Sequence, residues 1–516
     1  MRIISRLVRA ALPVCALAGA GAGAQATAKA PSKPAVETLA KTTAPPAFSV
    51  PKLPVERYTL PNGLTVLLSP DHAAPVAAVD IWYHVGSKNE LPGRTGFAHL
   101  FEHVMFNGSE HIPYGVHFKT IEGAGGNLNG STWNDRTNYF EAVPSNEMET
   151  ALWLESDRMG FLLPALDQAK LDAQREVVKN ERRQRVDNVP YGSEDEVIGA
   201  AMYPASHPYS WPVIGSMADL SAASLEDVKN FFRKYYAPTN ATLVVTGDFE
   251  PAATKALIAK YFGPIPAGPA ITRPSVPKIT LNVEKRLVLE DARAKLPQMT
   301  IAWPTVGDVD SDNAPLTALA RVLTQDRTSR LTKLLVYDRQ LATRVAASQN
   351  GDDSENAGRF EINVTPRPNA SLTEIEKLID STLAGLSTSP PGASEVDRFK
   401  NTTRVSSVTD LDGALNKAEI LAKGQTFFGD PLHYIVKTNE LLGVTPGDVA
   451  RVTKQYLTPG RIVVSMVPAG KLDLVSKPTL AYTNVTPKTE AAAKPSTAPP
   501  PAPASARVPT AVKAER

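Results

Sequence analysis

Cysteine is almost absent from this sequence, and its scarcity excludes several kinds of chemistry. Among 516 residues the only cysteine is Cys15, which lies in the first segment of the chain. A mature chain without that segment has no disulfide, no cysteine nucleophile and no cysteine metal ligand. Its stability must therefore come from the packing of a hydrophobic core.

Long apolar runs and an excess of one charge are also missing. After residue 24 no stretch approaches the roughly 20 apolar residues that a transmembrane helix needs. The 55 Lys and Arg residues almost balance the 53 Asp and Glu residues, which leaves a net charge of +2. We therefore expect no nucleic-acid partner and no membrane span in the mature chain.

Residues 1–24 have the features of a secretory signal peptide. Arg2, Arg6 and Arg9 precede a short apolar run, and a small-residue cleavage site follows at 22–24. The alternative is an uncleaved anchor. We expect the mature chain to be exported across the inner membrane, with the periplasm as its compartment.

The rest of the chain consists of two halves with a similar order of predicted elements, which indicates an internal duplication. The predicted segments are a disordered leader at 25–52, an N-terminal half at 53–263, a linker at 264–280, a C-terminal half at 281–475 and a disordered Pro/Ala-rich tail at 476–516.

Local patterns predict several individual elements. Asn62-Gly63 between two apolar runs indicates a β-hairpin. Residues 128–143 are strand-like, and residues 166–186 form one long charged helix. In the C-terminal half, a helix is predicted at 331–341 and the next strand at 358–364.

A helix predicted from Gly96 to Phe106 carries two histidines and a glutamate on one face. His99 and His103 lie one turn apart, with Glu102 beside His103, while the opposite face is apolar. The order His-x-x-Glu-His is that of the inverted zinc hydrolase motif. A histidine pair at this spacing also arises by chance, but the glutamate on an otherwise apolar helix favours metal. An ungapped alignment of the two halves places Ala, Leu and Thr opposite these residues, so the C-terminal half is expected to lack the motif.

Two histidines are not enough for a catalytic zinc ion, which needs three protein ligands and an open position. The long charged helix offers Glu176 and Glu181, and the residues alone do not choose between them. Most charged side chains on such a helix are simply solvated. The remaining histidines have no partner at ligand spacing: His72, His84, His111, His117, His207 and His433.

Three segments, together with the duplication, resemble the M16 metallopeptidases, the family of pitrilysin, insulin-degrading enzyme and mitochondrial processing peptidase. The segments are HLFEH at 99–103, TNYF at 137–140 and REVVKNERRQR at 175–185. The resemblance spans residues 53–470 and is strongest to compact bacterial members related to processing peptidase. It implies an α+β fold of two duplicated halves, each a mostly antiparallel sheet covered by helices.

The resemblance also implies roles for individual residues. The zinc ligands would be His99, His103 and Glu181, with one Zn²⁺ per chain. The ion would activate water and polarise the scissile carbonyl, and Glu102 would accept the water proton and pass it to the leaving amine. Asn129-Gly130-Ser131-Thr132 matches the family's edge strand, which binds extended peptides by strand addition. The alternative for this segment is an ordinary exposed edge strand.

Two departures from the family pattern bear on activity. Gln174 replaces an acid that usually precedes the third ligand, so any role of that charge is reduced or lost. Val336 and Thr343 stand where complete family enzymes have an Arg and a Tyr that hold the substrate and the oxyanion. Arg330 and Tyr337 have the right spacing but fall too early in the chain. We therefore expect a second M16-like chain, or a second copy in a homodimer, to supply the Arg/Tyr pair.

The sequence thus predicts a zinc-dependent endopeptidase that cleaves oligopeptides or unfolded segments as the zinc-bearing subunit of a two-chain enzyme. One alternative is a dedicated processing protease for a single exported peptide. Another is a non-catalytic scaffold subunit that keeps the M16 fold. The complete motif and Glu181 argue against the scaffold, because a scaffold has no physical need for a buried His-His-Glu face.

Overall fold

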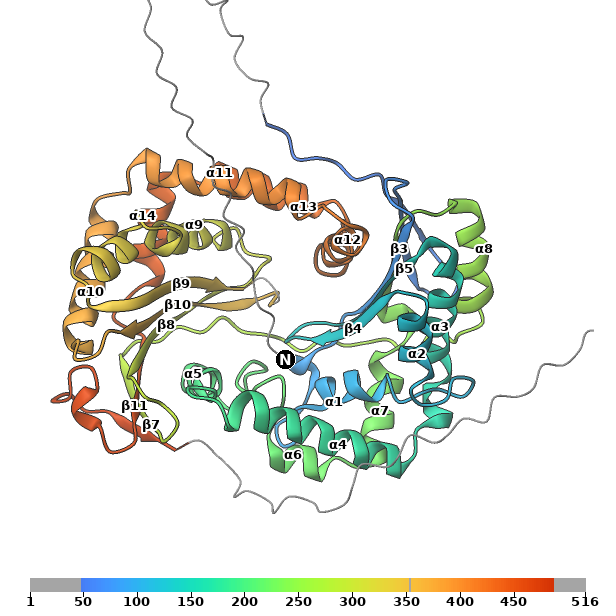
Figure 1. The fold of residues 1–516 in the computed structure, drawn as a ribbon, viewed down its shortest axis with the longest axis horizontal. Coiled ribbons are helices and arrows are strands. Elements are labelled where there is room, and N and C mark those ends of the chain that lie inside the picture. The colour runs from blue at the N-terminus through green and yellow to red at the C-terminus, as the bar shows by residue number, and fades with distance from the viewer. Residues whose placement is uncertain (1–47, 352–353, 487–516) are drawn as a thin grey trace, which may run out of the picture. The chain divides into compact units, whose positions relative to one another are not determined.

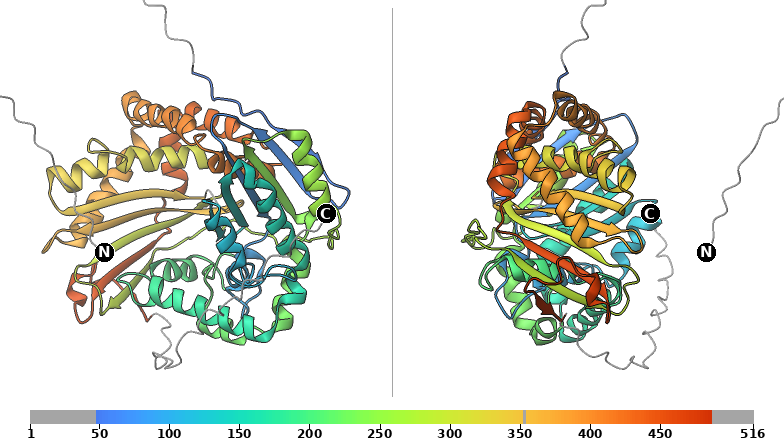
Figure 2. Two further views of the ribbon diagram at one scale, coloured as in Figure 1. Left: turned by 45° about the vertical axis from the view of Figure 1, so that its right-hand side comes forward. Right: turned by 90° about the vertical axis from the view of Figure 1, so that its left-hand side faces the viewer.

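The computed structural model describes residues 48–351 and 354–486, which contain two six-stranded mixed sheets (Figures 1 and 2). In order across the first sheet lie β1 (Glu56–Thr59), β2 (Thr65–Pro70), β6 (Ala241–Gly247), β3 (Val76–Tyr83), β5 (Thr137–Pro144) and β4 (Asn127–Thr132). In order across the second lie β12 (Thr483–Val485), β7 (Lys285–Asp291), β11 (Ile462–Pro468), β8 (Gln298–Val306), β10 (Ala357–Pro366) and β9 (Ala342–Asn350).

Five strands of each sheet repeat the same pairing, which confirms the predicted duplication. The pair β2 and β6 is parallel, and β6, β3, β5 and β4 then pair antiparallel in turn. The strands β7, β11, β8, β10 and β9 follow the same pattern. The fold class is therefore as predicted, with three parallel pairs, β2 with β6, β7 with β11 and β7 with β12, as the exceptions to mostly antiparallel pairing.

Helices of the N-terminal half are α1 (Phe97–Val104), α2 (Val116–Gly123), α3 (Met148–Ala165), α4 (Gln168–Arg182), α5 (Glu194–Met202), α6 (Met217–Ala222), α7 (Leu225–Tyr235) and α8 (Pro251–Phe262). Those of the C-terminal half are α9 (Asn313–Thr324), α10 (Leu372–Thr388), α11 (Ala393–Thr409), α12 (Ala414–Phe428), α13 (His433–Gly443) and α14 (Pro446–Tyr456).

The hairpin between β1 and β2 forms as predicted, and its turn is fixed to the rest of the half. Gly63 has φ of +88°, a conformation that glycine adopts without strain. The Asn62 side-chain amide donates to the carbonyls of Phe262 and Ile265, at 2.8 and 2.9 Å. The turn therefore also closes the C-terminal end of α8.

Each half contributes a helix to the sheet of the other half. In Figure 1, α12 lies against β3 and β5 of the first sheet, and its residues also contact β6. There Trp82, Leu67 and Val244 pack with Leu421 and other apolar residues of α12. The helix α5 in turn contacts β11 of the second sheet. Neither sheet is covered by its own half alone.

Three local predictions are wrong in detail. Residues 128–143 form two strands, β4 and β5, joined by a turn, and residues 342–350 form β9, which we did not predict. Both β4 and β9 are edge strands without the regular apolar alternation that marks a half-buried strand. The predicted helix at 331–341 is a π-helical turn at Thr332–Asp338, and the long charged helix ends at Arg182, followed by a π-helical turn at Arg183–Asp187.

The C-terminal boundary also differs from the prediction. The strand β12 pairs with β7 beyond residue 475, and Tyr482 packs near Val288 and Val467, so the tail begins later than predicted. The other segment boundaries stay predictions. The signal segment at 1–24, most of the leader and residues 487–516 of the tail lie outside the described residues. No helix in residues 48–351 or 354–486 combines the length and apolarity that crossing a bilayer requires.

A buried charge cluster lies between α2, β5 and α3, and it corrects the expectation that His117 has no partner at ligand spacing. His117 Nε2 contacts Glu141 Oε1, and the two oxygens of Glu155 bind Arg158, whose guanidinium lies 4.4 Å from the centre of the Tyr139 ring. Burial raises the pKa of both glutamates to about 7, and burial lowers the pKa of His117 to about 3. The Arg158 cation thus faces the carboxyl groups of Glu141 and Glu155. One proton bound to this pair of carboxyl groups leaves the cluster without net charge.

This balance predicts a pH dependence of stability. Because the folded chain holds the proton of Glu141 more tightly than the unfolded chain does, the contribution of Glu141 to stability should fall as the pH rises from about 4.5 to about 7. The lowered pKa of His117 acts in the opposite direction between about 3 and 6.5, so the difference between the wild type and Glu141→Gln isolates the carboxyl group. Glu141→Gln keeps a neutral polar group and should lose less melting temperature than the wild type between about pH 5 and pH 8. Thermal denaturation checks this, with the exposed Glu176→Gln as control; equal slopes for Glu141→Gln and the wild type would contradict it.

Candidate metal centre

The helix α1 separates an apolar face from a polar face, as its sequence requires. Leu100, Phe101 and Val104 are buried, and the Phe101 ring lies 5.2 Å from Phe232 and 4.6 Å from Tyr236 between ring centres. This packing against α7 and the residue after it fixes the rotation of α1 about its own axis. The polar face is thereby held toward α4 and β4.

The N-terminus of α1 is held by Glu90, a residue for which we predicted no role. Gly96 has φ of +85°, and a Cβ there would lie 2.8 Å from the carbonyl oxygen of Ile214. The buried carboxyl group of Glu90 accepts from the backbone N–H groups of Ala98 and Gly96, at 2.8 and 2.9 Å. It therefore satisfies N–H groups that a helix N-terminus leaves without partners. Its distance from the helix in sequence hides this role from any capping pattern.

The helix α4 brings the third predicted side chain to α1. Asp167 caps α4, and Gln174 donates to the Asn107 side chain at 2.7 Å, which ties α4 to the segment after α1. Glu181 Oε2 lies 3.1 Å from His103 Nε2 and 3.7 Å from His99 Nε2. One ligand atom from each of these three residues lies within 4.8 Å of the other two.

The other candidate on this helix lies elsewhere. Glu176 is exposed, and its carboxylate accepts from Lys179 at 3.2 Å. It is thus a solvated side chain, whereas Glu181 is mostly buried and its second oxygen accepts from Arg185 at 2.7 Å. Of the two acids that the residues alone left open, only Glu181 faces the histidines.

The donor set fits a divalent cation. Two imidazole nitrogens and a carboxylate oxygen are the ligands of many catalytic zinc sites, which leave a further position open. Burial, with a smaller effect of His103, lowers the pKa of His99 to about 4, so this ring is neutral at pH 7. A hydrogen bond from His103 lowers the pKa of Glu181 below its usual value. Neutral imidazole and ionised carboxylate are the protonation states that bind metal.

Glu102 lies beside this set but is held by β4. Thr132 Oγ1 donates to Glu102 Oε2 at 2.6 Å, and a Cβ on Gly130 would lie 3.0 Å from Glu102 Cγ. Burial raises the pKa of Glu102. A carboxyl group with a raised pKa next to three converging donors has the properties of a general base. A larger residue at position 130 would therefore press on the Glu102 side chain.

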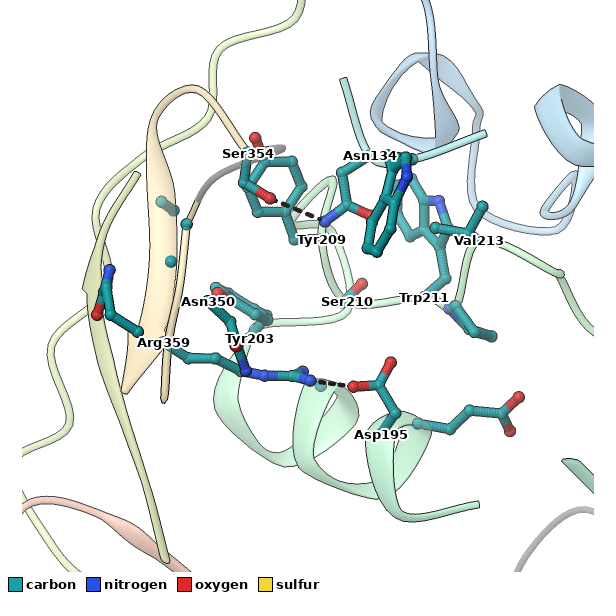
Figure 3. Close-up of a pocket in the computed structure, with 18 residues that line it drawn as sticks. Asn134, Asp195, Tyr203, Tyr209, Ser210, Trp211, Val213, Asn350, Ser354 and Arg359 are labelled. Carbon is teal, nitrogen blue, oxygen red and sulfur yellow. Dashed lines mark hydrogen bonds and ion pairs between the residues drawn. The ribbon is translucent and has the colours of Figure 1, made fainter. Parts of the chain in front are cut away.

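The predicted peptide-binding segment is the edge of the first sheet. In the described chain β4 pairs with β5 alone, so the other side of residues Asn129 to Thr132 carries no strand. A cavity of about 500 Å³ follows the end of β4 (Figure 3). Its lining includes Trp133 and Trp211, together with Asp195 of α5 and Arg359 of β10, which form an ion pair.

The alternative Arg/Tyr pair contacts other residues of the C-terminal half. Both nitrogens of the Arg330 fork bind Glu395, at 2.8 and 2.9 Å, and Tyr337 lies under the guanidinium of Arg327.

Comparison with known proteins adds the family. The family model described as Insulinase (Peptidase family M16) matches residues 65–206, and the Peptidase M16 inactive domain matches residues 222–403. The chain is 28% identical to "Zinc protease PqqE" of Helicobacter pylori over 78% of this chain and 90% of that protein. It is 22% identical to "Probable mitochondrial-processing peptidase subunit beta" of Arabidopsis thaliana over 79% of this chain and 77% of that protein.

Solved structures share the fold. A protease from Helicobacter pylori matches with a TM-score of 0.75 at 27% identity, covering 81% of this chain and 100% of that chain. Pitrilysin matches with a TM-score of 0.67 at 19% identity, covering 82% of this chain and 46% of that chain, and this likeness concerns the fold. The chain belongs to the M16 family of peptidases, whose named members here include zinc proteases.

The role of Glu90 leads to a prediction. Glu90→Ala removes the acceptor for two N–H groups at the start of α1, which should lower the stability by about 1 to 2 kcal/mol. It should also weaken zinc binding, because the two histidines would lose their fixed orientation. Thermal denaturation and competition with a chelating dye measure these effects. Glu90→Gln keeps an acceptor oxygen and should recover part of the stability and part of the zinc affinity. Wild-type stability and zinc affinity in Glu90→Ala would contradict the role of Glu90 at the N-terminus of α1.

Proposed function

We propose that this chain is a zinc-dependent endopeptidase that cleaves oligopeptides or unfolded segments. The observation that carries the proposal is the convergence of His99, His103 and Glu181, which each bring one ligand atom within 4.8 Å of the other two, beside Glu102. These three side chains would hold one zinc ion. The names of sequence relatives as zinc proteases support the choice of metal.

The proposed roles follow from the positions of the side chains. When bound, zinc supplies a Lewis acid that promotes water ionisation and polarises a carbonyl group. Glu102, oriented by the Thr132 hydroxyl, accepts the proton of the attacking water and returns it to the leaving amine. Residues Asn129 to Thr132 hold the substrate as an added strand through backbone hydrogen bonds, which place little demand on its sequence.

Substitutions can separate metal binding from catalysis. Glu102→Gln should retain zinc and lose cleavage of a quenched fluorescent peptide by roughly a hundredfold or more. Glu181→Gln should lose both zinc and activity, because it removes a charged ligand. Metal analysis and the peptide assay measure these outcomes.

The matched control is Glu176→Gln on the same helix, which should keep both properties. Full activity of Glu102→Gln would remove the general base, and zinc retention by Glu181→Gln at wild-type affinity would remove the third ligand.

We further propose that the active enzyme contains a second chain. The C-terminal half lacks an Arg/Tyr pair at the expected positions and matches a domain described as inactive. One sequence relative is named as a subunit of a processing peptidase, which supports a paired assembly. The partner would be a second M16-like chain or a second copy.

The signal-like segment at 1–24 supports a periplasmic location.

The two-chain proposal predicts weak activity from the isolated chain. Zinc-loaded chain purified alone should cleave peptides at least about tenfold more slowly than the same chain purified with its partner, since one transition-state contact is missing. Co-purification followed by the peptide assay tests this. Robust cleavage by a chain shown to be monomeric would contradict it, while activity confined to a dimer would identify the partner as a second copy.

A further inference from the structure

The strand β4 is held on both of its faces. Successive side chains of a strand point to opposite faces, so Thr132 and Ser131 point to opposite sides of the sheet. Thr132 binds Glu102 on the side of α1. On the other side the Ser131 hydroxyl donates to Asn138 Oδ1 at 2.7 Å. The second attachment leads away from the metal centre toward α12.

Asn138 in β5 is fully buried and uses its whole hydrogen-bonding capacity. Its oxygen accepts from Ser131 and, at 2.8 Å, from Arg136. Its amide nitrogen donates to Asp80 at 3.1 Å and to Glu419 at 2.9 Å. An amide has two donors and two acceptor sites, so every contact of this side chain is assigned and its orientation is fixed.

Glu419 is the one member of this network that comes from the C-terminal half. It lies on α12, 281 residues beyond Asn138, on the helix that packs against β3 and β5 in Figure 1. Arg136 also reaches β4 directly, because its guanidinium donates to the Ser131 carbonyl at 3.2 Å and contacts the Ser131 hydroxyl. The polar network therefore runs continuously from α12 through β5 to the edge strand.

We propose that Glu419 is a positioning residue for the active site of the same chain. Acting through Asn138 and Ser131, it fixes the edge strand to which peptide would add and, through Thr132, the orientation of Glu102. The C-terminal half then contributes to catalysis although it lacks the metal motif. The kinetic part of this inference rests on the proposed peptidase function, and its structural part does not.

An edge strand needs such support because it has a neighbour on one side only. Without the Glu419 carboxylate, a buried Asn138 N–H would lose its acceptor, and the amide would be free to turn. The two hydrogen bonds that Ser131 shares with Asn138 and Arg136 would then loosen. The expected consequence is a more mobile β4 with an intact metal site, since none of the three converging donors lies on β4.

The helix α12 offers a matched control. Lys417, two residues before Glu419, also joins α12 to the N-terminal half, through Asp71 just after β2. That contact lies at the opposite part of the sheet order from β4. Lys417→Ala therefore removes a comparable contact of the same helix without touching the network to Ser131.

The test compares Glu419→Ala, Glu419→Gln and Lys417→Ala in the full-length, zinc-loaded chain. Hydrogen exchange of residues 127–132 and the kinetics of peptide cleavage are the readouts. Glu419→Ala should speed exchange in β4 by roughly five- to tenfold and raise KM by a similar factor, with a smaller change in kcat and unchanged zinc content. Glu419→Gln keeps an acceptor oxygen and should stay within about threefold of the wild type in both.

Unchanged protection of β4 in Glu419→Ala would overturn the inference. Equal loosening of β4 by Lys417→Ala would also overturn it, because only docking of the helix would then matter. If the wild-type chain cleaves no peptide with or without its partner, the peptidase proposal fails, and the exchange data alone still decide the role of Glu419.

Discussion

The packing of α1 against α4 is the constraint on which the functional reading of this chain depends. The imidazoles of His99 and His103 on one short helix meet the carboxylate of Glu181 from a distant helix. Their polar atoms are mostly shielded from water at this place. Burial keeps His99 neutral and the contact with His103 keeps Glu181 ionised, so two of the three side chains already have the protonation states that bind metal. The apolar face of α1 supplies the packing energy that holds these groups together.

The remaining architecture fixes this arrangement from three directions. Glu90 holds the N-terminus of α1, Gln174 links α4 to the segment after α1, and Thr132 holds Glu102 from β4. The loss of an acid at position 174 is thus accompanied by a neutral hydrogen bond with a structural role. The helix α12 of the C-terminal half packs on the first sheet, and α5 of the N-terminal half contacts the second sheet. Each half therefore completes the other, which gives the C-terminal half a structural role although it lacks the metal motif.

Much of the fold and part of the site could be predicted from the sequence. The spacing of His99, Glu102 and His103 is local and fixes one face of a helix, so the motif needed no tertiary information. Glu176 and Glu181 lie five positions apart and therefore face different ways, and only the family resemblance chose between them. Glu419 and the partners of His117 escaped prediction because their contacts join distant segments, and Glu90 escaped it because it lies too far before α1 for a capping pattern. The edge strand β9 was missed because it has no apolar alternation.

X-ray absorption spectroscopy at the zinc edge of the metal-loaded chain tests the central claim most directly. The account predicts one zinc ion per chain with two imidazole ligands, the remaining ligands being oxygen, and loss of one imidazole signal in His103→Ala. A chain that binds no zinc, or a spectrum that is unaltered by His103→Ala, would contradict it.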